Sequence, residues 1–399
     1  MPAMREWMVT PSVVVDETRL RRNVDRMQQL ADAHGVQLRP HAKTHKTVEV
    51  AALQLSAGAS GLTVAKPSEA LKYLHSGLVA LKSVLVAYPV VQTAKVSKLL
   101  VAAKQFGVEV RVTVDSVNGV DAVEKAANSC DCAVKVLLHI DVGYHRVGLE
   151  EGDPRILEFA RRIDKSPNLE FAGLLSHAGH AYSCKTVEQC AEVAETERDI
   201  LVRIKSALEE NGIAVPVVSV GSTLTEPARK SFVGITEIRP GNYVFLDRTP
   251  VDIGLFSIKD VALGVLVTVV SSNKYHFIVD AGSKVLSSDA PRATDGGAFG
   301  SSCYGLAFYE KDFEHVEQPP TQYRTVLRDG REVVCFELCK LSEEHGWLRH
   351  VEGVPSPPIG QRLIVLPNHS CVVANLTDTL YVQGEHAKTW KVVARGCSQ

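Results

Sequence analysis

The sequence lacks the long apolar stretches of a membrane-spanning protein, since no run of about 18 apolar residues occurs. Its first ten residues, MPAMREWMVT, also lack the apolar core of a secretory signal peptide. Neither sign of charge is in large excess, because the chain has 44 basic and 46 acidic residues and a net charge of −2. Such a chain has no general attraction to nucleic acid or to an anionic membrane. We therefore expect a cytoplasmic protein with no nucleic-acid or membrane partner.

The cysteines cannot all be paired with one another, because their number is odd. The chain has nine cysteines among 399 residues, and an odd number in a long chain favours reduced thiols over a disulfide framework. Tandem repeats and low-complexity segments are absent, and 45% hydrophobic with 23% charged residues is ordinary globular usage. At roughly 150 residues per domain, this length accommodates about two or three domains, or one large barrel with an appended domain.

The N-terminal part of the chain alternates short Val/Ile/Leu runs with longer segments of helical period, which is typical of βα units around a parallel sheet. Residues 17–33, for example, predict a helix with Leu20, Val24 and Met27 on one stripe, and residues 186–208 predict another. Candidate strands are 36–41, 60–65, 83–88, 108–114, 133–141, 171–177, 215–220 and 235–245. Eight strands within about 230 residues match a (β/α)8 TIM-type barrel, with a doubly wound sheet as the alternative.

After about residue 255 the pattern changes to strand-like runs without long helices between them. Asp329-Gly330 lies between two such runs and is a hairpin signal. The early run SVVVD, before the first helix, is either a ninth barrel strand or part of this β region. We predict an α/β chain in which residues 17–254 form the barrel and residues 255–399 form a C-terminal β domain, with residues 1–16 an N-terminal segment of the β domain.

Reactive side chains follow several of the proposed strands. Lys43 follows the first strand, Arg146 the fifth and His177 the sixth. Residues past the carboxyl ends of barrel strands converge on one rim. A lysine beside arginines, under a rim of low dielectric constant, has its ammonium form disfavoured, which is the condition for a Schiff-base lysine.

Two small-residue turns follow the last two strands, Gly221-Ser222-Thr223 and Gly241-Asn242. Their backbone N–H groups and hydroxyls suit a phosphate, as barrel loops in these positions often do. A lysine and a phosphate site together predict a phosphate-bearing carbonyl cofactor, and pyridoxal phosphate fits. Taken singly, each feature has an ordinary explanation as a solvated lysine, a turn or a hydrogen-bonded core histidine. Only their common placement favours a site.

His369 and Cys371 form a second candidate site. Two residues apart on an extended segment, their side chains project to the same side and can share one cation, for which zinc is the best match. Two protein ligands with the remaining positions open would make the ion catalytic rather than structural. The alternative is a loop histidine beside a buried thiol.

Six segments carry a resemblance that covers nearly the whole chain: 40–46 (PHAKTHK), 141–148, 176–179, 239–243, 342–346 and 367–371 (PNHSC). With them the sequence resembles the D-threonine aldolase and D-serine dehydratase family of fold-type III pyridoxal phosphate enzymes, which is distantly similar to alanine racemase. The resemblance implies a homodimer whose subunits each contain a barrel and a β domain.

The resemblance also implies roles for individual residues. Lys43 would be the Schiff-base lysine, Arg146 would contact the phenolic oxygen of the cofactor, and His177 would lie against the pyridine ring, so that Lys43 and His177 form the catalytic set. Arg239 aligns with the arginine that meets the pyridine nitrogen in alanine racemase. The remaining cofactor-binding residues would be Tyr182, Ser222, Thr223, Gly241 and Asn242, and the metal ligands would be His369 and Cys371.

The resemblance favours a lyase of the D-serine dehydratase type, which eliminates water from a D-3-hydroxy amino acid to give a 2-oxo acid and ammonia. Such members carry His-x-Cys where aldolases carry His-x-Asp, and thiolate favours zinc over the manganese that carboxylate suits. The chemistry requires the cation to face the cavity that holds Lys43. Retro-aldol cleavage to glycine and an aldehyde stays open, as does racemisation, which Arg239 would suit. A pyridoxal phosphate homeostasis protein is the non-enzymatic alternative, and the long C-terminal β domain argues against it.

Replacing the proposed anchor tests the cofactor assignment. Lys43→Ala should abolish the visible absorbance of a cofactor bound through lysine, because no amine would be left at the end of the first strand to hold the aldehyde. The absorbance spectrum of the purified variant measures this. Absorbance that persists would place the anchor at another residue.

Overall fold

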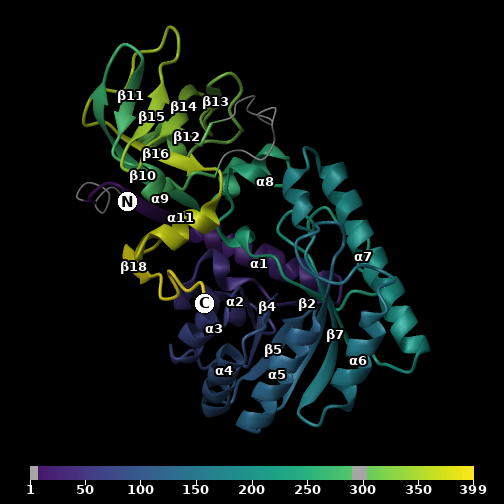
Figure 1. Cartoon of the computed structure of the whole chain (residues 1–399). Coiled ribbons are helices and arrows are strands. Elements are labelled where there is room, and N and C mark those ends of the chain that lie inside the picture. Colours follow the sequence, from purple (N-terminus) through teal and green to yellow (C-terminus); the bar gives the residue numbers. More distant parts are fainter. Residues whose placement is uncertain (1–7, 290–302) are drawn as a thin grey trace. The chain divides into compact units, whose positions relative to one another are not determined.

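The computed structural model describes residues 8–289 and 303–399, so the first seven residues of the predicted N-terminal segment lie outside the described ones. The chain divides into two compact units (Figure 1). The barrel unit contains Val24–Ala181, Glu188–Gly241 and Gly396–Gln399. The β unit contains the described residues of Met1–Asn23, Tyr182–Val187 and Asn242–Arg395.

The barrel unit is built on one parallel sheet. Its strands, in the order β2-β9-β8-β7-β6-β5-β4-β3, are β2 (Gln37–Leu38), β9 (Glu237–Ile238), β8 (Val217–Val220), β7 (Leu169–Ser176), β6 (Val134–Ile140), β5 (Glu109–Val114), β4 (Ser83–Pro89) and β3 (Leu62–Val64). A parallel bridge between His41 and Thr63 joins the two outer strands just past the end of β2. Each of the eight predicted strand segments overlaps one strand of this sheet, which confirms the TIM-type barrel over the doubly wound alternative.

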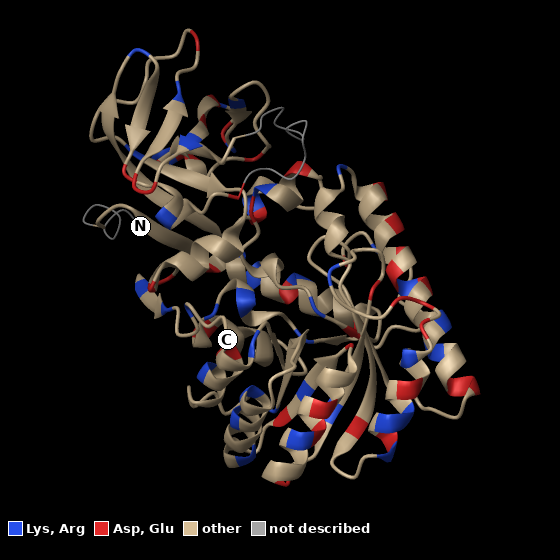
Figure 2. Ribbon diagram, in the orientation of Figure 1, with Lys and Arg blue, Asp and Glu red and all other residues tan. Residues whose placement is uncertain are grey.

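Helices follow the strands as the sequence pattern predicts. They are α1 (Glu17–Ala33), α2 (Val48–Ser56), α3 (Pro67–Leu74), α4 (Thr93–Phe106), α5 (Val117–Cys130), α6 (Arg155–Lys165) and α7 (Val187–Glu210), with the short 3-10 helices η1 (Ala42–Thr44) and η2 (Gly179–Ser183). Charged residues of both signs lie along α5, α6 and α7 (Figure 2), whereas the charged residues of α4 are all lysines. In α1 the predicted stripe of Leu20, Val24 and Met27 is buried. None of the described helices is long and apolar enough to cross a membrane.

The β unit contains a largely antiparallel sheet. Its described strands are β1 (Ser12–Asp16), β10 (Leu263–Ser272), β11 (His276–Val279), β12 (Gly305–Tyr309), β13 (Arg324–Val326), β14 (Glu332–Leu341), β15 (Gly346–Arg349), β16 (Arg362–Pro367), β17 (Thr379–Gln383) and β18 (Lys388–Lys391). Their order is β11-β15-β14-β12-β16-β10-β1-β17-β18, with β13 on β14, and β11 also pairs with β10. β1 pairs antiparallel with β10 and parallel with β17, so the early run SVVVD lies in this sheet. The Asp329-Gly330 turn joins β13 to β14, which form an antiparallel pair.

Short helices complete the β unit: η3 (Asn242–Val244), α8 (Arg248–Asp252), η4 (Ile258–Asp260), α9 (Ser283–Leu286), α10 (Glu310–Phe313) and α11 (Ser370–Leu376). Its core contains Leu266, Phe308 and Leu366, all buried. None of the nine cysteines forms a disulfide, as the odd count predicts.

The units divide at residues 23/24 and 241/242, whereas the sequence pattern placed the boundaries before residue 17 and after residue 254. The first turns of α1 account for the first difference, because Arg19 donates to the carbonyl oxygens of Val261 and Glu314. The second arises because Asn242 and its neighbours contact the loop that begins α11. These contacts join residues that are far apart in sequence, so the local hydrophobic periodicity cannot predict them.

A buried ion network supports the ends of β7 and β8. Arg229 pairs with Glu197 at 2.9 Å and with Glu226 at 2.8 Å, and all three side chains are inaccessible to solvent. Glu197 also accepts from the Ser176 hydroxyl at 2.8 Å. At Gly221, where φ is +99°, a Cβ atom would lie 2.4 Å from Glu226, so only glycine fits beside the network.

Removing the cation from this network should be costly. Arg229→Met leaves two carboxylates buried without their partner, and we expect it to lower the free energy of unfolding by about 3 to 5 kcal/mol. Chemical denaturation measures this. Arg203→Met is the matched control, because Arg203 pairs with Glu151 on the exposed side of α7 and its loss should change stability little. Equal effects of the two substitutions would contradict the network's role.

Candidate functional site

Seven of the predicted site residues lie at the carboxyl ends of the barrel strands. Lys43 lies in η1 after β2, Arg146 in the loop after β6, and His177 directly after β7. Ser222 and Thr223 follow β8, and Arg239 and Gly241 follow β9. Because all eight strands are parallel, these positions share one end of the sheet.

Four of these residues lie close together, so that the charges of three affect the pKa of the fourth. Burial lowers the pKa of His177 well below its ordinary value, and the charges of Lys43, Arg146 and Arg239 lower it further. Burial likewise lowers the pKa of His41, together with Lys43 and Arg239. The imidazoles of this cluster are therefore neutral and surrounded by cations.

The loop after β9 packs closely on the segment that carries Lys43. The backbone N–H of His41 donates to the carbonyl oxygen of Pro240 at 2.9 Å, and the His41 side chain caps η1 by accepting from the Lys43 N–H at 3.4 Å. A Cβ atom on Gly241 would lie 3.0 Å from both the His41 carbonyl oxygen and the Thr44 hydroxyl. Gly241 thus allows a close backbone approach to the lysine segment.

Arg239 is held in place by two neighbouring strands. Its guanidinium donates to the Ser219 hydroxyl at 2.7 Å and to the carbonyl oxygen of Ser176. The side chain is buried, and burial lowers its pKa. These contacts fix the cation at the ends of β7 and β8.

The turn after β8 is organised by its own hydroxyls. The Ser222 hydroxyl accepts from the backbone N–H groups of Leu224 and Thr225, both at 3.3 Å, and Ser222 is buried together with Thr223. These hydrogen bonds fix the conformation of the turn.

The residues of the barrel end fit an anionic cofactor. Three cations are gathered there around neutral imidazoles, and the Nδ1 atom of His139 is buried with no hydrogen-bond partner. A phosphate-bearing aldehyde would supply negative charge, and Lys43 would supply the amine that holds it.

Asp141 shapes the loop that carries Arg146. Its Oδ1 accepts from the backbone N–H groups of Gly143, Tyr144 and His145, each at 3.0 Å. Asp141 and His145, with Glu150, are grouped closely enough to hold a metal ion, but His145 and Glu150 are exposed. Since the carboxylate is already used by the backbone of its own loop, its evident role is to position that loop.

The second cluster of predicted residues lies in the β unit. Sequence reasoning placed His369 and Cys371 on an extended segment, and this is wrong for Cys371, because His369 is the N-cap of α11 and the chain is helical from Ser370 onward. The two side chains still meet. Although burial opposes it, the Cys371 thiolate and Asp247 raise the pKa of His369 well above its ordinary value. A nitrogen and a sulfur in contact are a donor set that fits zinc.

Tyr182 and Asn242 also belong to this second cluster. The Tyr182 ring meets the His369 ring edge-on, with centroids 6.3 Å apart. The Asn242 amide donates to the Ser370 hydroxyl at 2.8 Å and lies 3.7 Å from Cys371 Sγ. The side chain of Asn242 is therefore engaged with the metal pair, and only its backbone N–H remains for the predicted phosphate contact.

Sequence reasoning missed a buried carboxyl group near Lys43. Glu69, in the first turn of α3, is inaccessible to solvent and accepts from the Ala65 N–H at 2.8 Å through Oε2, while its Oε1 has no hydrogen-bond partner. Burial raises the pKa of Glu69 to about 7, against the opposing charges of Lys46 and Lys43. Acidic residues are common in the first turn of a helix, and Glu69 follows Pro67 at the start of α3, so the sequence gives no sign that its carboxyl group is buried.

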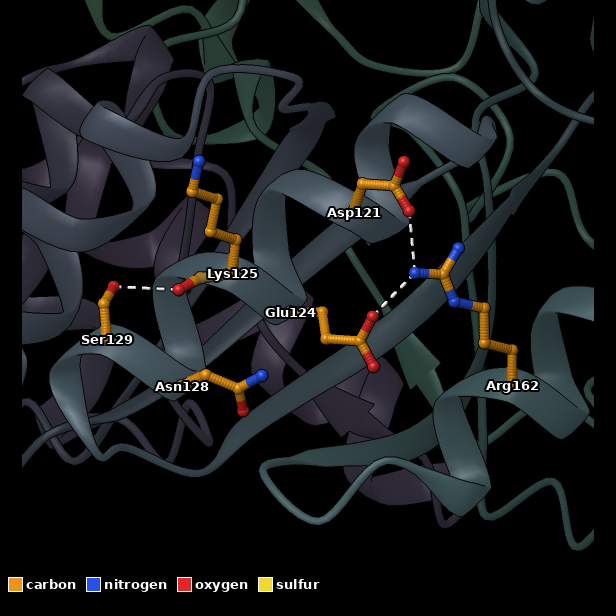
Figure 3. A pocket seen from close by; sticks show the side chains of 6 residues that line it. All are labelled: Asp121, Glu124, Lys125, Asn128, Ser129 and Arg162. Carbon is orange, nitrogen blue, oxygen red and sulfur yellow. Dashed lines mark hydrogen bonds and ion pairs between the residues drawn. The ribbon is translucent and has the colours of Figure 1, made fainter.

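A surface pocket elsewhere contains none of these residues (Figure 3). It lies between α5 and α6, where Arg162 bridges Asp121 at 2.7 Å and Glu124 at 2.6 Å. Its lining is a solvated charge cluster on the helices, so it is not the candidate site.

Comparisons with known proteins agree with this architecture. Residues 15–249 match the alanine racemase N-terminal domain, and residues 262–383 match the putative serine dehydratase domain. The D-threo-3-hydroxyaspartate dehydratase of Delftia sp. is 35% identical over 370 residues, which cover 91% of this chain and 90% of that protein. Its solved structure has a TM-score of 0.83 and 33% identity, and covers 96% of this chain and 97% of that one.

Two further relatives carry different activities in their names. The D-threonine aldolase of Arthrobacter sp. is 30% identical over 399 residues, which cover 98% of this chain and 93% of that protein. The D-serine dehydratase of Dictyostelium discoideum is 27% identical over 402 residues, which cover 94% of this chain and 93% of that protein.

The buried Glu69 should make stability depend on pH. Its pKa is about 7 in the folded protein and near its ordinary 4.5 when unfolded, so stability falls as pH rises from about 4.5 to about 7. Glu69→Gln removes this penalty, and its gain in free energy of unfolding should be roughly 2 to 3 kcal/mol larger at pH 8 than at pH 5.

Glu109→Gln is the control for this measurement. Although burial opposes it, Lys135 and Arg111 lower the pKa of Glu109 to about 2, so Glu109→Gln should cost more stability at pH 8 than at pH 3. Thermal unfolding across pH reads out both variants. A Glu69→Gln effect that is the same at pH 5 and pH 8 would show that Glu69 titrates normally.

Proposed function

The chain belongs to the family of alanine racemase-like enzymes that includes the D-serine dehydratases and D-threonine aldolases, and we propose that it is a dehydratase of this family. The proposed reaction removes water from a D-3-hydroxy amino acid and yields a 2-oxo acid and ammonia. The observation that carries it is the contact between His369 and Cys371 within the segment that matches the serine dehydratase domain.

Pyridoxal phosphate supplies an electron sink for charge that develops at the substrate α-carbon, and a metal ion supplies a Lewis acid for the β-hydroxyl, which is otherwise a poor leaving group. Lys43 would hold the cofactor through Nζ and, once released, take the α-proton at the same atom. Arg146 would hold the phenolic oxygen. His177, neutral because of burial and the surrounding cations, would lie uncharged against the ring.

Ser222, Thr223 and the backbone of Gly241 and Asn242 would hold the phosphate. His369 and Cys371 would hold the ion, with Tyr182 beside them. The thiolate supports zinc over manganese. One solved structure of a D-threo-3-hydroxyaspartate dehydratase is a metal-free form in which a cysteine is replaced by alanine, and this agrees with the proposal of a metal-binding cysteine in this chain.

Arg239 keeps racemisation as a second candidate. It is a buried cation fixed by Ser219 and Ser176, and an arginine at the pyridine nitrogen disfavours protonation of that nitrogen and weakens the electron sink. Proton exchange suits such a sink better than elimination does. A racemase has no evident use for the metal pair, however, which favours the dehydratase.

The proposal also includes the substrate class, the oligomeric state, the location and the partners of the enzyme. The substrate would be a small D-amino acid, the enzyme a homodimer in the cytoplasm, and nucleic acids and membranes would not be partners. The near-zero net charge supports the last point.

Product analysis tests the proposal. The zinc-loaded enzyme is incubated with D-serine, D-threonine and D-3-hydroxyaspartate, and we expect pyruvate, 2-oxobutyrate or oxaloacetate together with ammonia. Glycine with an aldehyde would establish retro-aldol cleavage instead, and inversion alone would establish a racemase. Bound cofactor without turnover would favour the homeostasis protein. Cys371→Ala is the companion variant: it should lose zinc and product but keep the visible absorbance of bound cofactor, and normal turnover would remove the metal from the proposal.

A further inference from the structure

Asp247, directly before α8, is a buried carboxylate that serves the loop of the metal pair. One of its oxygens, Oδ1, accepts from the Thr249 N–H at 3.1 Å and caps α8. The other, Oδ2, receives three groups: the Ser370 N–H at 2.9 Å, the Asn242 amide at 2.7 Å and His369 Nδ1 at 3.2 Å. The cap needs only the first oxygen, so the second has a separate task.

The partners of Oδ2 determine which nitrogen of His369 carries its proton. A backbone N–H and an amide N–H can only donate, so Oδ2 is an acceptor and His369 Nδ1 must donate to it. A neutral imidazole that is protonated at Nδ1 has its lone pair on Nε2. A cation shared with Cys371 can therefore be bound by His369 only through Nε2.

Asn242 acts on the segment between the two ligands. Its amide nitrogen contacts Asp247 Oδ2 and lies 3.7 Å from Cys371 Sγ. A carboxylate and a thiolate are both acceptors, so the nitrogen and not the oxygen of the amide must face them. The two N–H groups of the amide have closer partners in Asp247 Oδ2 and the Ser370 hydroxyl, which the amide reaches at 2.8 Å, so the contact with the sulfur is a longer, shared one. Asn242 therefore holds Ser370, the residue between the two metal ligands, beside Asp247.

We propose that Asp247 and Asn242 are positioning residues for the metal ligands, with Asp247 fixing His369 for binding through Nε2 and Asn242 holding Ser370, the residue between the two ligands. The proposal rests on the metal dependence in the proposed function. Hydrogen-bond partners of this kind set ring orientation and ligand basicity, and their loss typically weakens metal binding by about 10- to 100-fold.

Zinc affinity of the cofactor-loaded enzyme tests the role of Asp247, by competition with a chromophoric chelator. Asp247→Asn should bind zinc about 10- to 100-fold more weakly while keeping the visible absorbance of bound cofactor. Asp260→Asn is the matched control, because Asp260 is a buried carboxylate of the same unit that accepts from Ser257 and Arg22, and its loss should leave zinc affinity unchanged. Wild-type affinity in Asp247→Asn, together with loss of zinc in His369→Ala, would overturn the proposal.

A second measurement uses the wild-type protein and so does not depend on a variant that folds. In zinc-loaded enzyme labelled with ¹⁵N-histidine, the His369 signal, identified by its loss in His369→Ala, should show a proton on Nδ1 and zinc on Nε2. Zinc on Nδ1 would overturn the proposal. A wild-type enzyme that binds no zinc would remove the metal from the proposed function and this inference with it, whereas normal zinc binding with an unaffected Asp247→Asn removes the inference alone.

Discussion

Closure of the parallel sheet is the constraint on which the barrel site depends. The bridge between His41 and Thr63 joins the strands at the two ends of the sheet order, so that the segment carrying Lys43 stands beside the loop after β9. Without closure, β2 would be an edge strand and its lysine would stand at a margin of the sheet. Closure instead gathers residues from β2, β6, β7 and β9, which are up to about two hundred positions apart in sequence, around one end.

The two clusters treat buried charge in opposite ways. At the barrel end, Lys43, Arg146 and Arg239 lie among histidines that burial keeps neutral, which favours a ligand that brings negative charge. In the β unit, Asp247 supplies a carboxylate within the protein, and its partners are all donors. The first arrangement suits an anionic cofactor, and the second suits ligands that must hold a fixed geometry for a cation.

Local patterns predicted the fold well and the contacts of the site poorly. The helix over 17–33 and all eight barrel strands followed from periodicity, which is a property of neighbouring residues. Asp247 and the side-chain role of Asn242 could not be foreseen, because their partners His369 and Cys371 lie more than a hundred residues away. Cys371 was expected on an extended segment because it closely follows the strand-like run 362–366, whereas α11, a helix of only seven residues, begins at Ser370.

The place of β1 has a consequence for how the chain is made. This strand is synthesised before its two neighbours, β10 and β17, and the whole parallel sheet is encoded between β1 and β10. Throughout translation of the intervening barrel segments, a run of valines has neither of its hydrogen-bonding partners. A nascent chain of this protein therefore carries a strand with unpaired backbone groups until both β10 and β17 have been synthesised, and this is the stage at which chaperones would matter most.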